Sequence, residues 1–333
     1  MSAFNHVPLR TFDATNIRHV SRYPRGGLSS LDVGENRFFE RDLQYIIPEM
    51  VNFDHALISA RTVLPIDRRG GPAAQVVRFR QITKTGAAKI ITDYANDIPF
   101  SNVFAEEFTG NVRSIAEAAG WSIQEIRSAA LANVPLDREK SDAAREDMLR
   151  RENAIAWNGD ATHGLVGIMT DANIPRTTVP DGASTDPEWS TKTGAEQVAD
   201  LNLLVNTIPE TTGMVEAPDT VLLPPAQYHL ALETRMETGT DTTALAFFVA
   251  NSPYIKSMDD VIPVNELVGA GTAGVDVGIA YKRDMSKLAL QVPLDIEQFP
   301  PQEVDLLVKT IYHMRTGGVT VKKPLSLHMI EAI

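Results

Sequence analysis

The chain has 333 residues, 43% of them apolar, which suffices for one large domain or two ordinary ones and excludes wholesale disorder. Its formal net charge of -12 argues against a free nucleic-acid-binding protein, although an acidic body can still carry a basic face. The absence of cysteine excludes disulfides, thiolate metal sites and a cysteine nucleophile. No stretch has the apolar run of a signal peptide or a membrane span, so we expect a soluble, intracellular protein.

The first 25 residues are polar and irregular, with a single acid, Asp13, and four arginines: Arg10, Arg18, Arg22 and Arg25. Two interpretations are open. The segment is either a mobile tail, or an arm that becomes ordered on a neighbouring subunit or lies against a polyanion. Glu35–Met50 then has the apolar spacing of a helix, which Pro48 closes.

A long two-stranded ribbon is predicted between Val63 and Phe100. Gln75–Thr83 alternates in polarity, Thr85-Gly86 is expected to turn the chain, and Lys89–Tyr94 is expected to return as the second strand. Four cations gather near its tip and are candidates for contact between subunits: Arg78, Arg80, Lys84 and Lys89. Because an isolated ribbon is at best marginally stable, it packs either on its own domain or on another chain.

The stretch from Phe108 to Ile168 reads as a compact scaffold. Val112–Ala118 is predicted as a strand that Gly120 ends. Ser122 and Glu125 have the form of a capping box, which predicts a helix to about Ala132. A second, longer helix is predicted over Asp137–Trp157, ended by the turn residues Asn158-Gly159-Asp160.

The long helix is charged almost all round, with expected ion pairs of Glu146 with Arg150 and Asp147 with Arg151. Its apolar stripe is thin and consists mainly of Ala144, Met148 and Ile155. Such a helix lies along a surface. It either presents a solvated face or lines an interface or an internal cavity.

The second half of the chain begins with a polar loop, 175–192, that is a plausible hinge. A compact α/β part is predicted after it, with helices over Gly194–Ile208, Pro225–Glu233 and part of Thr240–Asn251, and strands at Thr220–Leu223 and within Val261–Val292. Two long closing strands, Val304–Met314 and Val319–Ile330, would pair with the Val112 strand, which would make the α/β part an insertion.

No catalytic, cofactor-binding or metal-binding residue is predicted. Gly269–Gly274 fits G-x-G-x-x-G, but the alternating segment Val275–Tyr281 follows it, whereas a dinucleotide site needs a helix there. We therefore expect a turn between strands. His163, beside the glycine turn, is the one histidine in a suggestive place, and a surface or capping role is favoured over a ligand or base.

These pieces together resemble the major capsid proteins of tailed bacteriophages, which share the Hong Kong 97-type fold with encapsulins. The resemblance spans about Ala60 to Ile333. It rests on four segments in order: the basic ribbon Val63–Phe100, the strand, elbow and long helix from Gly120 to Asp160 followed by GLVGI, Pro218–Pro224 with Gln227-Tyr228, and Arg315–Val319 followed by Pro324-Leu325.

The resemblance implies an α+β chain with an N-terminal arm, an extended loop, a peripheral domain with a spine helix, and an inserted axial domain. The corresponding boundaries are 1–60 for the arm and leading helix, 61–107 for the extended loop, 108–193 for the peripheral domain, 194–300 for the axial domain and 301–333 for the closing strands. The ribbon would lie on a neighbouring subunit. The arginines of the first 25 residues would face the interior of the shell.

By the same resemblance, the expected function is that of a shell protein, not an enzyme, that assembles into hexamers and pentamers around phage double-stranded DNA in the virion. The DNA would be bound through its phosphates without reading of sequence. Portal and scaffolding proteins, and in some cases decoration proteins, would be further partners, and no membrane or cofactor is implied. Two alternatives stay open: an encapsulin-type compartment that holds cargo protein, and a soluble α/β enzyme without a recognisable motif.

Overall fold

A computed structural model describes residues 57–90, 99–132, 136–237, 239 and 241–333 of the chain. All of these residues belong to one structural unit, residues 56–333. Helices and largely antiparallel sheets alternate irregularly along it, as expected for the α+β class. The predicted helix Glu35–Met50 lies outside the described residues.

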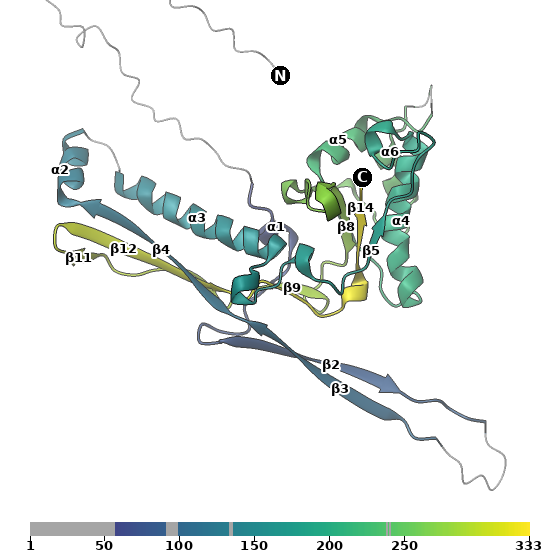
Figure 1. The fold of residues 1–333 in the computed structure, drawn as a ribbon, viewed down its shortest axis with the longest axis horizontal. Helices are drawn as coiled ribbons and strands as arrows, with labels where there is room; N and C mark the ends of the chain where they lie inside the picture. The colour runs from purple at the N-terminus through teal and green to yellow at the C-terminus, as the bar shows by residue number, and fades with distance from the viewer. Residues whose placement is uncertain (1–56, 91–98, 133–135, 238, 240) are drawn as a thin grey trace, which may run out of the picture. The chain divides into compact units, whose positions relative to one another are not determined.

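The predicted ribbon consists of β2 (Val76–Thr85) and β3 (Asn102–Asn111), which run side by side in Figure 1. Their antiparallel register runs from Val76 opposite Asn111 to Thr85 opposite Asn102. The predicted turn at Thr85-Gly86 is therefore wrong, and β3 takes the place of the predicted return over Lys89–Tyr94, of which residues 91–94 lie outside the described residues. A partner as long as β3 satisfies the backbone groups of one edge of β2 along its whole length, which a shorter return cannot do.

A four-stranded sheet contains β4 (Arg113–Ser122), β12 (Leu307–Thr316), β10 (Leu294–Gln298) and β11 (Gln302–Val304). β4 and β12 are antiparallel over their full length, which confirms the predicted pairing of these distant segments. Gly120 does not end the strand as predicted. It pairs with Lys309, and the side chain of Leu307 lies 3.5 Å from the position of a Cβ at Gly120, so the strand continues to Ser122.

Two helices follow β4 directly. The capping box predicted for α2 (Ile123–Ala132) is confirmed: the Glu125 amide donates to Ser122 Oγ at 3.1 Å, and the Ser122 amide donates to Glu125 Oε2 at 2.9 Å. The long helix, α3 (Leu136–Asn158), packs on β4 and β12 through its thin apolar stripe. The buried residues of this small core are Ala119, Trp121, Ala144, Met148, Tyr312 and Met314.

The charged face of α3 is only partly as predicted. Arg150 Nη2 lies 2.9 Å from Glu146 Oε1, which confirms that pair. Asp147 instead contacts Arg150, at 2.9 Å, and Arg151 contacts Asp160, at 2.7 Å. Asp160 lies just past the end of the helix, so Arg151 joins the last turn of α3 to the segment after it.

A turn built on close backbone contacts ends α3. Gly159 adopts φ +69°, and a Cβ there would lie 2.7 Å from the Leu165 carbonyl oxygen and 2.8 Å from the Gly167 amide nitrogen. Only glycine fits such a position without strain. The predicted helix stop at this glycine is thus explained by the packing of the segment that follows.

The largest core cluster lies around a small sheet of β1 (Ile66–Asp67), β9 (Leu288–Gln291) and β13 (Val319–Val321). The short helix α1 (Ala60–Val63) and the C-terminal end of α3 pack into the same cluster. Trp157 from α3 is fully buried there, and its Nε1 donates to Ser59 Oγ at 3.1 Å. The segment that leads into the ribbon is therefore fixed on the end of the long helix.

The predicted α/β part contains a five-stranded sheet in the order β5 (Arg176–Thr178), β14 (Leu327–Glu331), β8 (Val277–Tyr281), β6 (Thr220–Leu223) and β7 (Val261–Pro263). Three helices form a second core cluster with it: α4 (Gly194–Thr212), α5 (Pro225–Glu233) and α6 (Ala244–Asn251). The glycine-rich segment 269–274 precedes the strand β8. This confirms the prediction that a strand follows it, where a dinucleotide site would need a helix.

The last segment differs from the prediction of a single strand over Val319–Ile330. It divides into β13, a 3₁₀ turn at Pro324–Ser326, and β14. Pro324 has no amide to donate to a ladder, which interrupts the strand. β13 then pairs with β9, and β14 pairs with β5 and β8, so neither extends the β4–β12 ladder.

Replacing Gly159 with alanine tests the turn after α3. Gly159→Ala should lower the free energy of unfolding by more than the roughly 1–2 kcal/mol expected for the left-handed conformation alone, because the new methyl also meets backbone atoms. Gly213→Ala is the matched control, since Gly213 ends α4 with φ +62° and has open space around it. Urea unfolding of the unassembled chain measures both. Equal effects would contradict the packing argument.

Candidate assembly surfaces

The ribbon has two distinct faces, because residues opposite each other in an antiparallel pair point the same way. One face, called the cationic face below, carries Arg78, Arg80, Ile82 and Lys84 with the opposite residues Thr109, Glu107, Ala105 and Val103. The other, the aromatic face, carries Phe79, Gln81 and Thr83 with Phe108, Glu106 and Phe104. Three of the four predicted contact residues thus share one face.

Carboxylates only partly neutralise the cationic face. Glu107 lies 3.2 Å from Arg80 Nε and 3.6 Å from Arg78 Nη1, so one acid serves two guanidinium groups. Lys84 is exposed on the same face, near the far end of β2. The fourth predicted residue, Lys89, is exposed and lies beyond the strand.

Large apolar side chains on the ribbon are exposed, and the sequence interpretation did not single them out. Ile82, Val103 and Phe104 are 60%, 62% and 59% exposed. Ile82 and Val103 lie on the cationic face and Phe104 on the aromatic face, so both faces of the outer ribbon expose apolar side chains of the kind that another molecule covers. Val103 and Phe104 belong to Asn102–Asn111, which the sequence interpretation did not assign to the ribbon.

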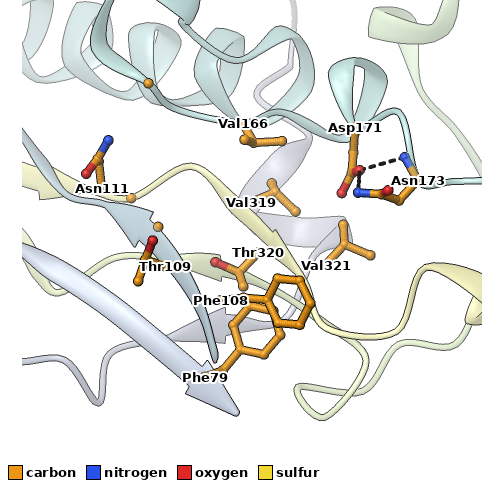
Figure 2. Close-up of a pocket in the computed structure, with 13 residues that line it drawn as sticks. Phe79, Phe108, Thr109, Asn111, Val166, Asp171, Asn173, Val319, Thr320 and Val321 are labelled. Carbon is orange, nitrogen blue, oxygen red and sulfur yellow. Dashed lines mark hydrogen bonds between the residues drawn. The ribbon is translucent and has the colours of Figure 1, made fainter. Parts of the chain in front are cut away.

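The base of the ribbon rests on its own chain. Phe79 and Phe108 stack at 5.2 Å between ring centroids and line a cavity of about 200 Å³ whose opposite wall is β13 (Figure 2). Asp171 and Asn173 form the polar edge of this cavity, where the Asn173 amide donates to Asp171 Oδ1 at 2.9 Å. From Gln81 onward β2 is exposed at every position. The base of the ribbon therefore packs on its own chain, as the first alternative predicted, and the outer part has no cover within the described chain.

A charged network fixes the segment that leads into the ribbon. Arg61 contacts Glu152 of α3 at 2.5 Å and Asp295 of β10 at 2.9 Å, and Arg68 reaches Asp295 at 3.1 Å. Burial raises the pKa of Glu152, and the hydrogen bond and positive charge of Arg61 offset only part of that effect. The network joins three parts of the sequence at the root of the ribbon.

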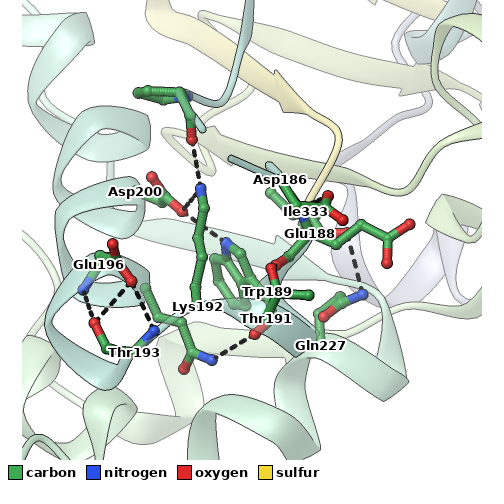
Figure 3. A network of polar contacts seen from close by, with 12 residues as sticks. Asp186, Glu188, Trp189, Thr191, Lys192, Thr193, Glu196, Asp200, Gln227 and Ile333 are labelled. Carbon is green, nitrogen blue, oxygen red and sulfur yellow. Dashed lines mark hydrogen bonds and ion pairs between the residues drawn. The ribbon is translucent and has the colours of Figure 1, made fainter. Parts of the chain in front are cut away.

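A second network, shown in Figure 3, is too deeply enclosed to act on a substrate. Lys192 Nζ contacts Asp200 Oδ2 at 2.7 Å, and Trp189 Nε1 donates to the same oxygen at 3.0 Å. The Lys192 and Asp200 side chains are 1% and 5% exposed. Burial raises the pKa of Asp200, against the opposing effect of Lys192. This pair holds the loop before α4 against that helix.

The remaining candidates for chemistry have structural partners. His163 is exposed, in line with the favoured surface role, and its Nδ1 lies 2.9 Å from Asp160 Oδ2, while the Asp160 side chain caps a short turn by accepting from the His163 amide. His328 is buried between Thr177 Oγ1 and the Leu204 carbonyl, each at 3.0 Å. Among the described residues, no group of three or more histidine, aspartate or glutamate side chains is placed to hold a metal ion.

The sequence model of the family described as "Major capsid protein" matches residues 86–333. The chain belongs to the major capsid protein family. Comparison with curated proteins gives no match. The predicted contact residue Lys89 falls within the matched region, whereas Arg78, Arg80 and Lys84 precede it.

Solved capsid structures share the fold of this member of the major capsid protein family. The capsid of Myoviridae phage XM1 matches with a TM-score of 0.77 at 15% identity, over 89% of this chain and 99% of that chain. A structure from Gordonia phage Cozz matches with 0.58 at 16% identity, over 86% and 90%. A virus-like particle from Pyrococcus furiosus matches with 0.51 at 11% identity, over 82% and 92%. The Hong Kong 97-type fold implied by the sequence is confirmed.

No helix among the described residues is both long and apolar enough to cross a bilayer.

The burial of His328 predicts a pH-dependent stability. Burial lowers the pKa of His328 below 6.5, although its hydrogen bond to the Leu204 carbonyl acts in the opposite direction. Between the lowered pKa of His328 in the folded chain and its ordinary pKa of about 6.5 in the unfolded chain, the unfolded chain binds more protons. The free energy of unfolding should therefore fall as the pH drops below about 6.5. His328→Gln should make this slope shallower in urea titrations at pH 5.5 and 7.5. His229→Gln, at an exposed position, is the control, and an unchanged slope in His328→Gln would contradict the prediction.

Proposed function

We propose that the chain is the shell-forming subunit of a tailed-phage head, in which copies associate as hexamers and pentamers of an icosahedral shell around double-stranded DNA. Membership in the major capsid protein family supports the shell itself. The observation that carries the assembly role is the ribbon, which exposes Ile82, Val103 and Phe104 in the single chain. A neighbouring copy that covers them would supply the burial that two strands alone lack.

In this proposal the arginine-rich first 25 residues face the enclosed DNA, through Arg10, Arg18, Arg22 and Arg25. Contacts of arginine with phosphate need no base sequence, which suits a shell around any genome. The basic arm favours DNA over the alternative of a protein compartment with protein cargo. Portal, scaffolding and decoration proteins are further expected partners, and they follow from the family alone.

The domain names belong to the same proposal. Residues 1–60 would be the arm and leading helix, 61–107 the extended loop, 108–193 the peripheral domain, 194–300 the axial domain and 301–333 the closing strands. Because β14 pairs within the five-stranded sheet, the last segment would serve both folded parts. We infer a structural role without catalysis, supported by the enclosed state of the Lys192–Asp200 pair.

Expression of the full chain tests the proposal directly. Gel filtration and negative-stain microscopy under assembly conditions should show rings or closed shells. Particles from the native host should contain nuclease-protected DNA. Small discrete oligomers under all conditions would contradict a shell role, and particles with protected protein but no DNA would favour the compartment.

Ribbon variants test which contacts support assembly. Replacing Ile82 and Phe104 with serine should weaken assembly more than replacing Arg78, Arg80, Lys84 and Lys89 with alanine. Burial of one large apolar side chain contributes about 1.5–3 kcal/mol, whereas an exposed ion pair contributes about 0–1 kcal/mol. The concentration at which half the chain sediments as particles is the measurement.

Two controls make these ribbon variants informative. The unassembled chain should unfold at the same urea concentration with either set of changes, since the side chains are exposed. Loss of monomer stability would instead place the outer ribbon in the chain's own core. A charge-matched set of exposed cations away from the ribbon, Arg127, Arg138, Arg235 and Lys256, controls for the change in net charge.

A further inference from the structure

A second cavity, of about 520 Å³, lies at the root of the ribbon on the side of β2 that β3 does not cover. We call it the root cavity. Its charged and amide lining comes from segments far apart in the sequence: Asp67 and Arg69 at and after β1, Arg78 in β2, Gln291 in β9, and Lys322 after β13. The fold therefore brings these groups together, although no local sequence motif predicts the site.

The root cavity has more positive than negative charge. Its lining contains three cations and one carboxylate, Asp67. Arg69 already binds that carboxylate through two contacts, at 2.7 and 2.9 Å. Lys322 lies farther away, at 3.7 Å, and donates to the Met285 carbonyl. Arg78 shares Glu107 with Arg80. Lys322 and Arg78 thus each share a carboxylate with an arginine, Lys322 with Arg69 and Arg78 with Arg80.

A buried amide in the same wall lacks a partner. Gln291 is 2% exposed, and its side-chain nitrogen Nε2 has no hydrogen bond within the described chain. The backbone of the same residue is fully used, since its amide donates to the Gly318 carbonyl and its carbonyl accepts from Gly317. The side chain is therefore held in place with an unused donor. A buried donor left without an acceptor is costly, which predicts that an acceptor arrives.

We propose that the root cavity is a binding site for a carboxylate, and that a neighbouring copy of this chain supplies it in the assembled shell. This occupant rests on the function proposed above. A carboxylate accepts several hydrogen bonds at once, so it can take the Gln291 amide while it neutralises Lys322 and Arg78. An apolar side chain would leave the Gln291 amide without an acceptor and would add no negative charge beside Lys322 and Arg78.

Two observations favour a neighbouring copy over a free anion. The chain carries 43 acidic and 31 basic residues, so the surface of another copy presents mainly carboxylates to a positive cavity. The cavity also continues into β2, whose outer part carries the exposed apolar side chains that a neighbour is expected to cover. One neighbouring molecule on the ribbon would therefore lie next to the opening of the root cavity.

Gln291→Leu provides a sharp test, because it separates stability from assembly. In the unassembled chain the change removes a donor that has no partner, so the midpoint of urea unfolding should stay constant or rise. In assembly it removes a hydrogen bond to a charged group, so the concentration needed for half-assembly should rise at least about tenfold. Lys322→Gln should act in the same direction on assembly, with Lys256→Gln as the charge-matched control.

Gln197→Leu is the matched control for stability. Gln197 is equally buried and its Oε1 also lacks a partner, but its Nε2 donates to the Trp189 carbonyl at 3.1 Å and to Thr234 Oγ1 at 3.4 Å. Loss of a used donor should lower the unfolding midpoint, in contrast to Gln291→Leu. Equal losses of stability in the two variants would overturn the assignment of Gln291 as an unpartnered donor.

A density map of the assembled shell distinguishes the remaining outcomes. A carboxylate of a neighbouring copy within hydrogen-bond distance of Gln291 Nε2 or Lys322 Nζ would support the proposal. A cavity in the shell that is empty, apolar-filled or occupied only by an added anion such as phosphate would overturn it while leaving the shell function intact. If the unmodified chain forms no shells at all, the proposed function fails and this occupant falls with it.

Discussion

The antiparallel ladder between β4 and β12 is the interaction on which the other parts of the described chain depend. It joins Arg113 to Thr316 and Ser122 to Leu307, so two segments far apart in the sequence pair, with β12 in the middle of the sheet and β4 at its edge. α3 packs on these two strands, β10 and β11 extend the sheet from β12, and the ribbon strand β3 ends just before β4 begins. Since the ladder closes a very long loop, its many hydrogen bonds and buried side chains must offset the entropy of bringing these ends together.

The same arrangement leaves the ribbon in a special position. At its root it is tied to α3 by Arg61 and Glu152, and at its base Phe79 and Phe108 face β13. Beyond that point the described chain offers no surface to cover it. Rigid anchoring at one end with exposed apolar groups at the other suits a contact with a neighbour, because an anchored ribbon loses little conformational entropy when it binds.

Local patterns predicted the elements that local physics decides. The capping box of α2, the apolar stripe of α3 and the glycine after α3 each depend on residues close in sequence, and each was predicted correctly. The return of the ribbon was missed because a turn signal at Thr85-Gly86 said nothing about the competing partner Asn102–Asn111. The last strand was missed because Pro324 changes which sheet the chain joins, and that choice depends on β8 and β5.

The candidate surfaces also divide into features that the sequence predicted and features that it did not. Alternation over Gln75–Thr83 predicted a strand, and the register of β2 with β3 places Arg78, Arg80 and Lys84 on one face. Exposure of Ile82 and Val103 on that face was not predictable, because alternating apolar residues usually mark a buried face. The root cavity was not predictable from the sequence either, because Asp67, Gln291 and Lys322 share a wall only once β1, β9 and β13 have assembled.

The unpartnered Gln291 donor and the exposed apolar side chains of the ribbon contribute differently to assembly: the apolar side chains contribute affinity, and the donor contributes specificity. Apolar contact lowers the free energy of association with almost any apolar surface, so Phe104 cannot by itself distinguish a correct neighbour from a misplaced one. The Gln291 amide gains only from an acceptor at one place, and it stays unsatisfied when the neighbour is misplaced. Trp121 Nε1 and Tyr312 OH also lack partners, but they lie in the closed core under α3, away from the lining of the root cavity. Of these three residues, Gln291 alone lines the root cavity, so in the proposed contact the affinity of the ribbon and its specificity would come from separate groups.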